Sequence, residues 1–170
     1  MKKIIIGILI LIMSLNILGC ENKSGQDFNF DYTIKENYSE KITPKLSQAF
    51  LDFTKDTNDL YKTGFVDFKE YDPMKGITIG ELEYYMYETL QDYNSINNWN
   101  VYEEEVLELM REQRLTVSDL ALLKLTHTNC ELDKQSEREP EFDEEYFDTE
   151  IEKLKIRMVE VLESTKEYIK

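Results

Sequence analysis

The sequence contains a single histidine, His127, and this scarcity restricts the chemistry open to the chain. A zinc site with several histidines, the paired Glu-x-x-His motifs of di-iron bundles and a Cys-x-x-Cys-His haem attachment are all excluded. A nucleophilic site would have to use His127 as its base, and no serine lies in a nucleophile-elbow pattern. There is also no Gly-rich phosphate loop and no Asp-x-Asp-x-Asp-Gly calcium loop. We therefore expect a protein that is not an enzyme and has no cofactor.

Basic side chains are few relative to acidic ones. The chain has 20 Lys and Arg against 35 Asp and Glu, a formal charge of -15. Such a charge disfavours nucleic acid as a partner and is compatible with cations or basic peptides. A well-solvated surface is the favoured explanation of the charge. With so many acids, a pair of carboxylates carries no information about catalysis.

Long apolar runs are confined to the N-terminus. Lys2 and Lys3 precede a nearly unbroken apolar run from Ile4 to Leu18. As a helix this run would be about 22 Å long, which is short of the ~30 Å hydrocarbon core of a bilayer. A basic start followed by a short apolar run predicts a secretory signal peptide at residues 1–19 rather than a transmembrane anchor.

The end of this run, Ile17-Leu18-Gly19-Cys20, resembles the lipobox of bacterial lipoproteins. The resemblance implies cleavage before Cys20, a diacylglyceryl group on its sulfur, and acyl chains such as palmitate that anchor the chain on the extracytoplasmic face of the cell membrane. Two acyl chains are sufficient for stable anchoring. A plain signal peptide with an incidental cysteine is the alternative. If Cys20 is acylated, Cys130 has no partner for an intrachain disulfide.

Residues 20–42 are predicted to be a lipid-anchored linker. From Glu21 to Glu40 they would span at most about 66 Å when extended. Within them Phe28, Phe30, Tyr32 and Ile34 alternate with polar residues, which predicts an extended strap lying on the domain. Residues 64–68 are the one candidate strand partner.

Residues 43–170 are predicted to form an all-α, up-and-down helical bundle of about five helices. In most of the predicted helices apolar side chains recur at alternating spacings of 4 and 3 residues. The predicted helices are 43–64, 78–97 with Thr78 and Glu81 as a capping box, 100–114, 116 to about 130, and 143–169. The fourth is the best candidate for the central helix. The heptad pattern of the last helix could instead form a coiled coil between chains, in a structural, self-associating bundle.

Two groups of residues are candidate sites. Tyr84 and Tyr87, followed by Trp99 and Tyr102, could form a partner-binding surface. The alternative, burial of this face between neighbouring helices, is the favoured interpretation. His127 and Cys130, with Glu131 nearby, could bind a metal or support catalysis. Since His127 and Cys130 lie on an apolar stripe, a core histidine beside a buried thiol is the favoured interpretation, and we expect no metal.

These observations favour a membrane-anchored extracytoplasmic lipoprotein that acts as a non-catalytic binding module. Its expected partner is a protein or peptide of the cell envelope. An immunity or exclusion-type protective lipoprotein is an alternative by analogy with small lipoproteins of this size. A metal-binding or enzymatic bundle using His127 and Cys130, and a self-associating structural bundle, are the others.

Overall fold

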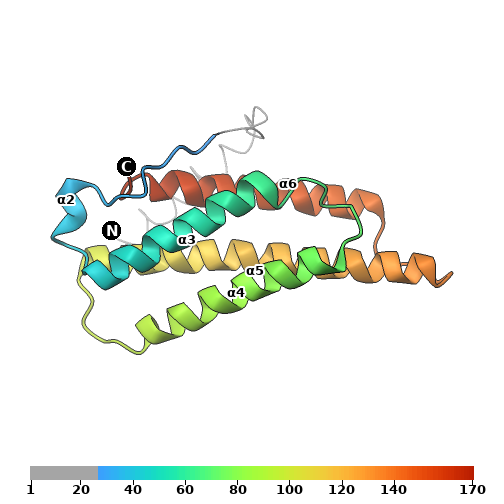
Figure 1. Ribbon diagram of the computed structural model, residues 1–170, viewed down its shortest axis with the longest axis horizontal. Coiled ribbons are helices and arrows are strands. Elements are labelled where there is room, and N and C mark those ends of the chain that lie inside the picture. The colour runs from blue at the N-terminus through green and yellow to red at the C-terminus, as the bar shows by residue number, and fades with distance from the viewer. Residues whose placement is uncertain (1–26) are drawn as a thin grey trace, which may run out of the picture.

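The computed structural model describes residues 27–170, and its elements within this range are helices apart from one isolated β-bridge (Figure 1). The helices are α2 (Glu36–Ser39), α3 (Pro44–Thr63), α4 (Pro73–Asn94), α5 (Val101–Gln135) and α6 (Glu144–Thr165). The prediction of an all-α helical bundle is confirmed. No helix among the described residues is long and apolar enough to cross a membrane.

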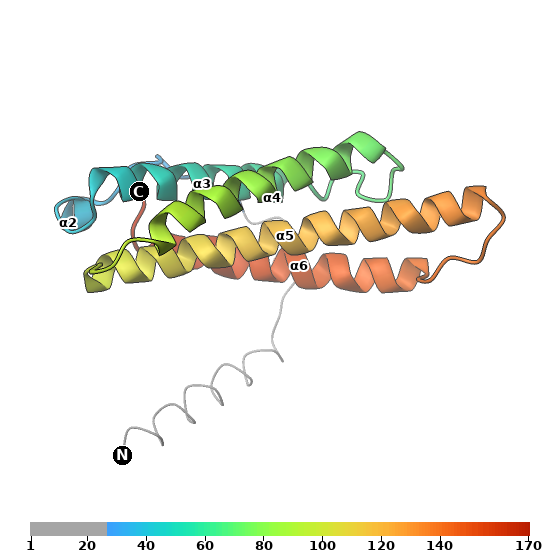
Figure 2. The ribbon, with the colours of Figure 1, turned by 90° about the horizontal axis from the view of Figure 1, so that it is seen from below.

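Helix α5 is the centre of the bundle. It packs against α3, α4 and α6, whereas α4 packs chiefly against α5 (Figures 1 and 2). The four long helices run up and down in sequence order. The core contains large side chains that are fully buried, among them Phe50, Phe53, Leu107, Met110, Leu120, Phe147, Met158 and Leu162. The location of the central helix is therefore as predicted.

The predicted break between a third and a fourth helix is wrong, because α5 runs without interruption from Val101 to Gln135. Thr116 resembles an N-cap in the sequence, but its hydroxyl donates to the Gln113 carbonyl oxygen at 2.7 Å inside the helix. No proline or glycine lies within α5 to stop it. The helix begins at Asn100 as predicted, where Asn100 and Glu103 form a capping box.

The predicted start of the second helix at Thr78 is also wrong. Helix α4 begins five residues earlier, at Pro73, with Asp72 as its N-cap accepting a hydrogen bond from the Met74 amide. Proline is favoured in this first helical position. The Thr78 hydroxyl donates to the Met74 carbonyl oxygen within the helix. Helix α3, by contrast, begins after Thr43 and ends before Gly64 as predicted.

The N-terminal strap is part of the folded domain from Phe28 onward. Phe28 and Phe30 are buried, and Asn58 of α3 donates a hydrogen bond to the Phe28 carbonyl oxygen at 3.0 Å. The strap pairs with the C-terminus through the antiparallel bridge between Ile34 and Ile169, rather than with residues 64–68. The part of the predicted linker 20–42 that the structure describes, residues 27–42, thus belongs to the folded domain.

The apolar stripe of α6 faces the interior of the chain. Its buried members include Phe147, Ile151, Leu154, Met158, Val161 and Thr165. The helix ends at Thr165. The buried Tyr168 follows in a turn and the buried Ile169 in the bridge to Ile34, rather than in the predicted extension of the helix. Because these side chains are covered within one molecule, the stripe is not available for a coiled coil between chains.

Candidate functional site

The predicted lipidation site, Cys20, lies outside the described residues, as does the whole predicted signal peptide. The strap shows on which side of the bundle the described chain begins. Phe28 packs against Tyr61 of α3, with a ring-centroid separation of 5.6 Å, and the Lys166 Nζ lies 4.7 Å from the Phe28 ring centroid. The strap therefore lies over α3 and the end of α6, whereas α4 lies on the opposite side of the molecule (Figure 1).

Three tyrosines are exposed in the middle of α4: Tyr84, Tyr85 and Tyr87, with 62%, 46% and 40% of their surfaces accessible. We call these residues the tyrosine surface. At 3.6 residues per turn Tyr84 lies at the centre of the outer face, with Tyr85 and Tyr87 on either side of it. The helix turns Ile79, Met86, Leu90 and Tyr93 toward the bundle instead. Burial of Tyr84 and Tyr87 between helices, the alternative considered from the sequence, is therefore wrong.

The tyrosine surface is acidic. Glu81, Glu88 and Asp92 are exposed around it, and α4 contains no basic residue after Lys75. The negative charge of Glu88, and the hydrogen bond that the Tyr84 hydroxyl donates to its carboxylate, raise the pKa of Tyr84 above its ordinary value. The surface therefore combines neutral aromatic rings with negative charge, which suits a cationic ligand.

One edge of the tyrosine surface already holds a cation. The Arg114 guanidinium lies 5.1 Å from the ring centroid of Tyr87 and forms an ion pair with Glu83. The same combination of a ring and a carboxylate recurs in the outer face of α4, at Tyr84 and Glu88, which point to solvent. This contact shows the chemistry by which the rest of the surface could bind an arginine or lysine.

Trp99 and Tyr102 are separated from this surface. Both are half-buried at the end of the bundle where α4 passes into α5. Trp99 packs on Tyr93, with ring centroids 6.0 Å apart, while Tyr102 packs on Tyr38 and lies beneath the Lys41 Nζ at 4.4 Å. These two side chains have partners within the chain, so the four residues predicted from the sequence do not form one surface.

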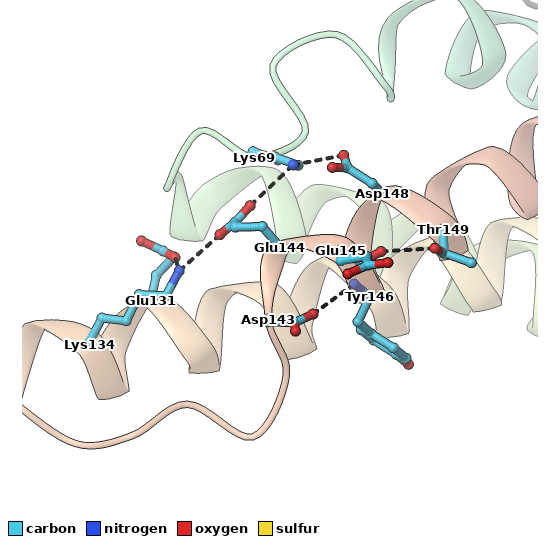
Figure 3. Close-up of polar contacts among 9 residues, drawn as sticks. All are labelled: Lys69, Glu131, Lys134, Asp143, Glu144, Glu145, Tyr146, Asp148 and Thr149. Carbon is cyan, nitrogen blue, oxygen red and sulfur yellow. Dashed lines mark hydrogen bonds and ion pairs between the residues drawn. The ribbon is translucent and has the colours of Figure 1, made fainter.

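A second cluster of polar residues lies where α5 approaches the start of α6 (Figure 3). The Lys134 Nζ contacts Glu131 at 2.6 Å and Glu144 at 2.9 Å. The Lys69 Nζ, from the connection between α3 and α4, contacts Glu144 at 3.2 Å and Asp148 at 2.7 Å. Hydrogen bonds from Lys134 and Lys69 hold the pKa of Glu144 below its ordinary value.

His127 belongs to this second cluster. Its ring is 1% exposed and lies between Phe68 and Phe147, at centroid separations of 5.8 Å and 4.9 Å. Burial, with the nearby charge of Lys124, lowers the pKa of His127. One of its ring nitrogens lies within 4.8 Å of carboxylate oxygens of Glu131 and Glu144.

Cys130 does not join these ligand atoms. It is a buried free thiol on α5, and the group that gathers around His127 includes Glu144 in its place. The sequence suggested His127 and Cys130 as a pair, with Glu131 nearby as a third ligand. It did not indicate Glu144, which comes from a different helix.

Sequence reasoning also missed Lys124, which is buried in α5 with 1% of its surface exposed. It lines a cavity of ≈ 360 Å³ together with apolar residues of α3 and α4, including Leu60, Met74 and Ile79. Burial lowers the pKa of Lys124. Its Nζ donates to two backbone carbonyl oxygens, so this lysine fastens a loop rather than presenting a free amine.

No family model matches the chain, and comparisons with curated proteins and with solved structures find no match either.

Proposed function

We propose that this protein is a lipid-anchored, extracytoplasmic binding module that holds a basic segment of an envelope protein on the tyrosine surface of α4. The observation that carries the proposal is the exposure of Tyr84, Tyr85 and Tyr87 on one acidic helix face. Tyrosine is enriched at recognition surfaces, because it contributes a large apolar area and a hydrogen-bonding hydroxyl at little cost in conformational entropy.

The position of α4 supports an anchored arrangement. The described chain begins beside α3 and α6, on the side of the bundle opposite α4 (Figure 1). Cys20 lies eight positions before the buried Phe28, and the chain between their Cα atoms can span at most about 29 Å. A lipid on Cys20 would hold the bundle near the membrane by its strap side and leave α4 accessible from the periplasm or the cell exterior.

The charge of the molecule supports a basic partner. Loss of residues 1–19 would remove Lys2 and Lys3, leaving 18 basic against 35 acidic side chains and a formal charge of -17. A field of this sign accelerates association with cationic segments and repels anionic ones. Specificity would then come from the aromatic rings, which place lysine or arginine side chains at defined positions.

The proposal is tested by photo-cross-linking in intact cells. The full chain carries p-benzoylphenylalanine in place of Tyr84, and the matched control carries it in place of Ile156, which is 45% exposed on α6. Cross-linked peptides are then identified by mass spectrometry. We expect position 84 to cross-link to one envelope protein, through a segment rich in lysine and arginine. Position 156 should give no such cross-link.

The anchor is tested with the Cys20→Ala form of the same chain. This form should not be labelled by palmitate and should leave the membrane fraction. It should also lose the cross-link from position 84. Equal capture from positions 84 and 156, or a cross-linked segment that is neutral or acidic, would contradict the proposed binding surface.

A further inference from the structure

We propose that His127, Glu131 and Glu144 form a binding site for a divalent transition-metal cation, with Zn²⁺ as the best-matched ion, joining α5 to α6. The inference is independent of the proposed function, because this cluster lies on residues that the tyrosine surface does not use. It departs from the expectation of no metal, and it also differs from the metal alternative considered from the sequence, since Glu144 takes the place of Cys130 among the ligands.

The geometry needs little rearrangement. One ligand atom from each of the three residues lies within 4.8 Å of the others. Ligand atoms about 2.0 Å from a tetrahedral ion are roughly 3.3 Å apart, so the atoms must approach each other by at most about 1.5 Å. Glu144 is exposed and Glu131 half-buried, and rotation about their side-chain bonds provides this movement while the backbone stays in place.

The His127 side chain is already ordered and has a ring nitrogen without a hydrogen-bond partner. Its Nδ1 is buried and has no hydrogen-bond partner, a costly arrangement for a polar atom. Phe68 and Phe147 fix the plane of the ring. Each of these features reduces the cost of ordering the site on metal binding.

A positive charge already occupies the space between the carboxylates. The Lys134 ammonium contacts both Glu131 and Glu144 (Figure 3). Lys134 lies in the last turn of α5 with 39% of its side chain exposed, so it can move into solvent when a doubly charged ion takes its place. Lys69 would keep its contact with Asp148 after releasing Glu144.

The ligand set identifies the class of ion. One imidazole and two carboxylates match Zn²⁺, which accepts mixed nitrogen and oxygen ligands and leaves a fourth position for water. Ca²⁺ and Mg²⁺ prefer sites made entirely of oxygen. The ion would cross-link α5 to the beginning of α6, because His127 and Glu131 precede the charged connection 136–143 and Glu144 follows it.

The test is calorimetric titration of the full chain, in detergent and without a histidine tag, with Zn²⁺ after chelator treatment. We expect one ion per chain and much weaker binding of Ca²⁺. Glu144→Gln should weaken Zn²⁺ binding by about tenfold or more, because it removes a ligand. The matched control is Glu145→Gln, an exposed neighbour in the same helical turn, which should bind Zn²⁺ like the unmodified chain.

Lys134→Gln tests the competition between lysine and metal. Removal of the competing ammonium should strengthen Zn²⁺ binding by about tenfold. Circular dichroism checks that each variant keeps its helical content, and Co²⁺ absorption shows whether nitrogen and oxygen ligands bind a single ion. Absence of stoichiometric binding in both the unmodified chain and Lys134→Gln would overturn the site. Equal weakening by Glu144→Gln and Glu145→Gln would also overturn it, because it would indicate only diffuse attraction to an acidic surface.

Discussion

The Nζ of Lys124, in the middle of α5, donates a hydrogen bond of 2.7 Å to the carbonyl oxygen of Phe68 in the connection between α3 and α4. A second bond of 2.7 Å goes to the Glu70 carbonyl oxygen. The stem of Lys124 packs beside Gly76 of α4, where an added Cβ would lie 3.6 Å from the Lys124 Cγ. A single buried ammonium therefore fixes the path of the chain between two helices.

Replacement of Lys124 by methionine removes both charge-assisted hydrogen bonds while keeping most of the side-chain volume. We expect the free energy of unfolding to fall by about 2–4 kcal/mol. Each such bond contributes about 1.5–3 kcal/mol, and part of the loss is offset because methionine removes the cost of burying an ammonium. Urea denaturation measures the change. Lys62→Met, at an exposed site with one surface ion pair to Asp27, should change stability by less than about 0.5 kcal/mol. Equal effects of the two substitutions would show that the buried bonds do not stabilise the loop.

Gln113 joins three helices from a fully buried position. Its Nε2 donates to the Thr54 hydroxyl in α3 at 3.0 Å and to the Thr165 hydroxyl in α6 at 3.1 Å. Gln113→Ala should destabilise the fold by about 2–4 kcal/mol, because it leaves a cavity and removes both bonds. Gln48→Ala, at an exposed site in α3, is the control for thermal and urea unfolding. A loss below about 1 kcal/mol at position 113 would mean that the polar contact is dispensable.

The strap provides a test of where the folded domain begins. Phe28 is fully buried, so Phe28→Ala should lower the free energy of unfolding by about 3–5 kcal/mol. The neighbouring Asn29 is exposed, and Asn29→Ala should have almost no effect. Hydrogen exchange provides a second measurement, because the amides of Asp31 and Lys35 donate to the C-terminal backbone and should be protected. Unprotected amides and equal stabilities would place the strap outside the cooperative fold.

His127 predicts a specific dependence of stability on pH. Its pKa in the folded state lies below the ordinary value of 6.5, because burial and Lys124 disfavour the charged ring. The unfolded chain therefore binds the proton first, and stability is lost as the pH falls from about 6.5 through the lower folded-state pKa. Three other charged groups influence the pKa of His127 to a smaller extent: the carboxylates of Glu131 and Glu144 and the ammonium of Lys134.

The measurement compares the free energy of unfolding at pH 7.5 and pH 5.0, with a chelator present. The unmodified chain should be less stable at pH 5.0, and His127→Leu should show a smaller difference between the two values. Because the chain has one histidine, no other imidazole contributes. An unchanged difference in the variant would assign the pH dependence to the carboxylates instead.

The sequence predicted what depends on local pattern. The apolar stripes of α3 and α6, the start of a helix near Asn100 and the alternation of Phe28 and Phe30 all correspond to structure. The predicted helix starts at Thr116 and Thr78 are wrong. A threonine hydroxyl can cap the start of a helix, but within a helix it can also donate to a preceding backbone carbonyl oxygen. Asp72 followed by Pro73 carried the correct start signal for α4.

The candidate sites depended on contacts between elements distant in sequence, which local patterns do not contain. Helical spacing relates His127 to Glu131, but Glu144 joins them only because α6 folds back along α5. Likewise, the exposure of Tyr84 and Tyr87 follows from the packing of α4 chiefly against α5. Trp99 and Tyr102 resemble these tyrosines in composition, but they have partners at the end of the bundle.

The central claim is that α4 binds a basic segment, and charge reversal at this face tests it most directly. The measurement is the cross-link yield from position 84 in intact cells, with and without Glu81→Lys and Glu88→Lys together. The control pair is Glu145→Lys and Glu160→Lys, both exposed on α6. Our account predicts loss of the cross-link with the α4 pair and an unchanged yield with the α6 pair. A cross-link that persists when α4 carries lysines at both positions would contradict it.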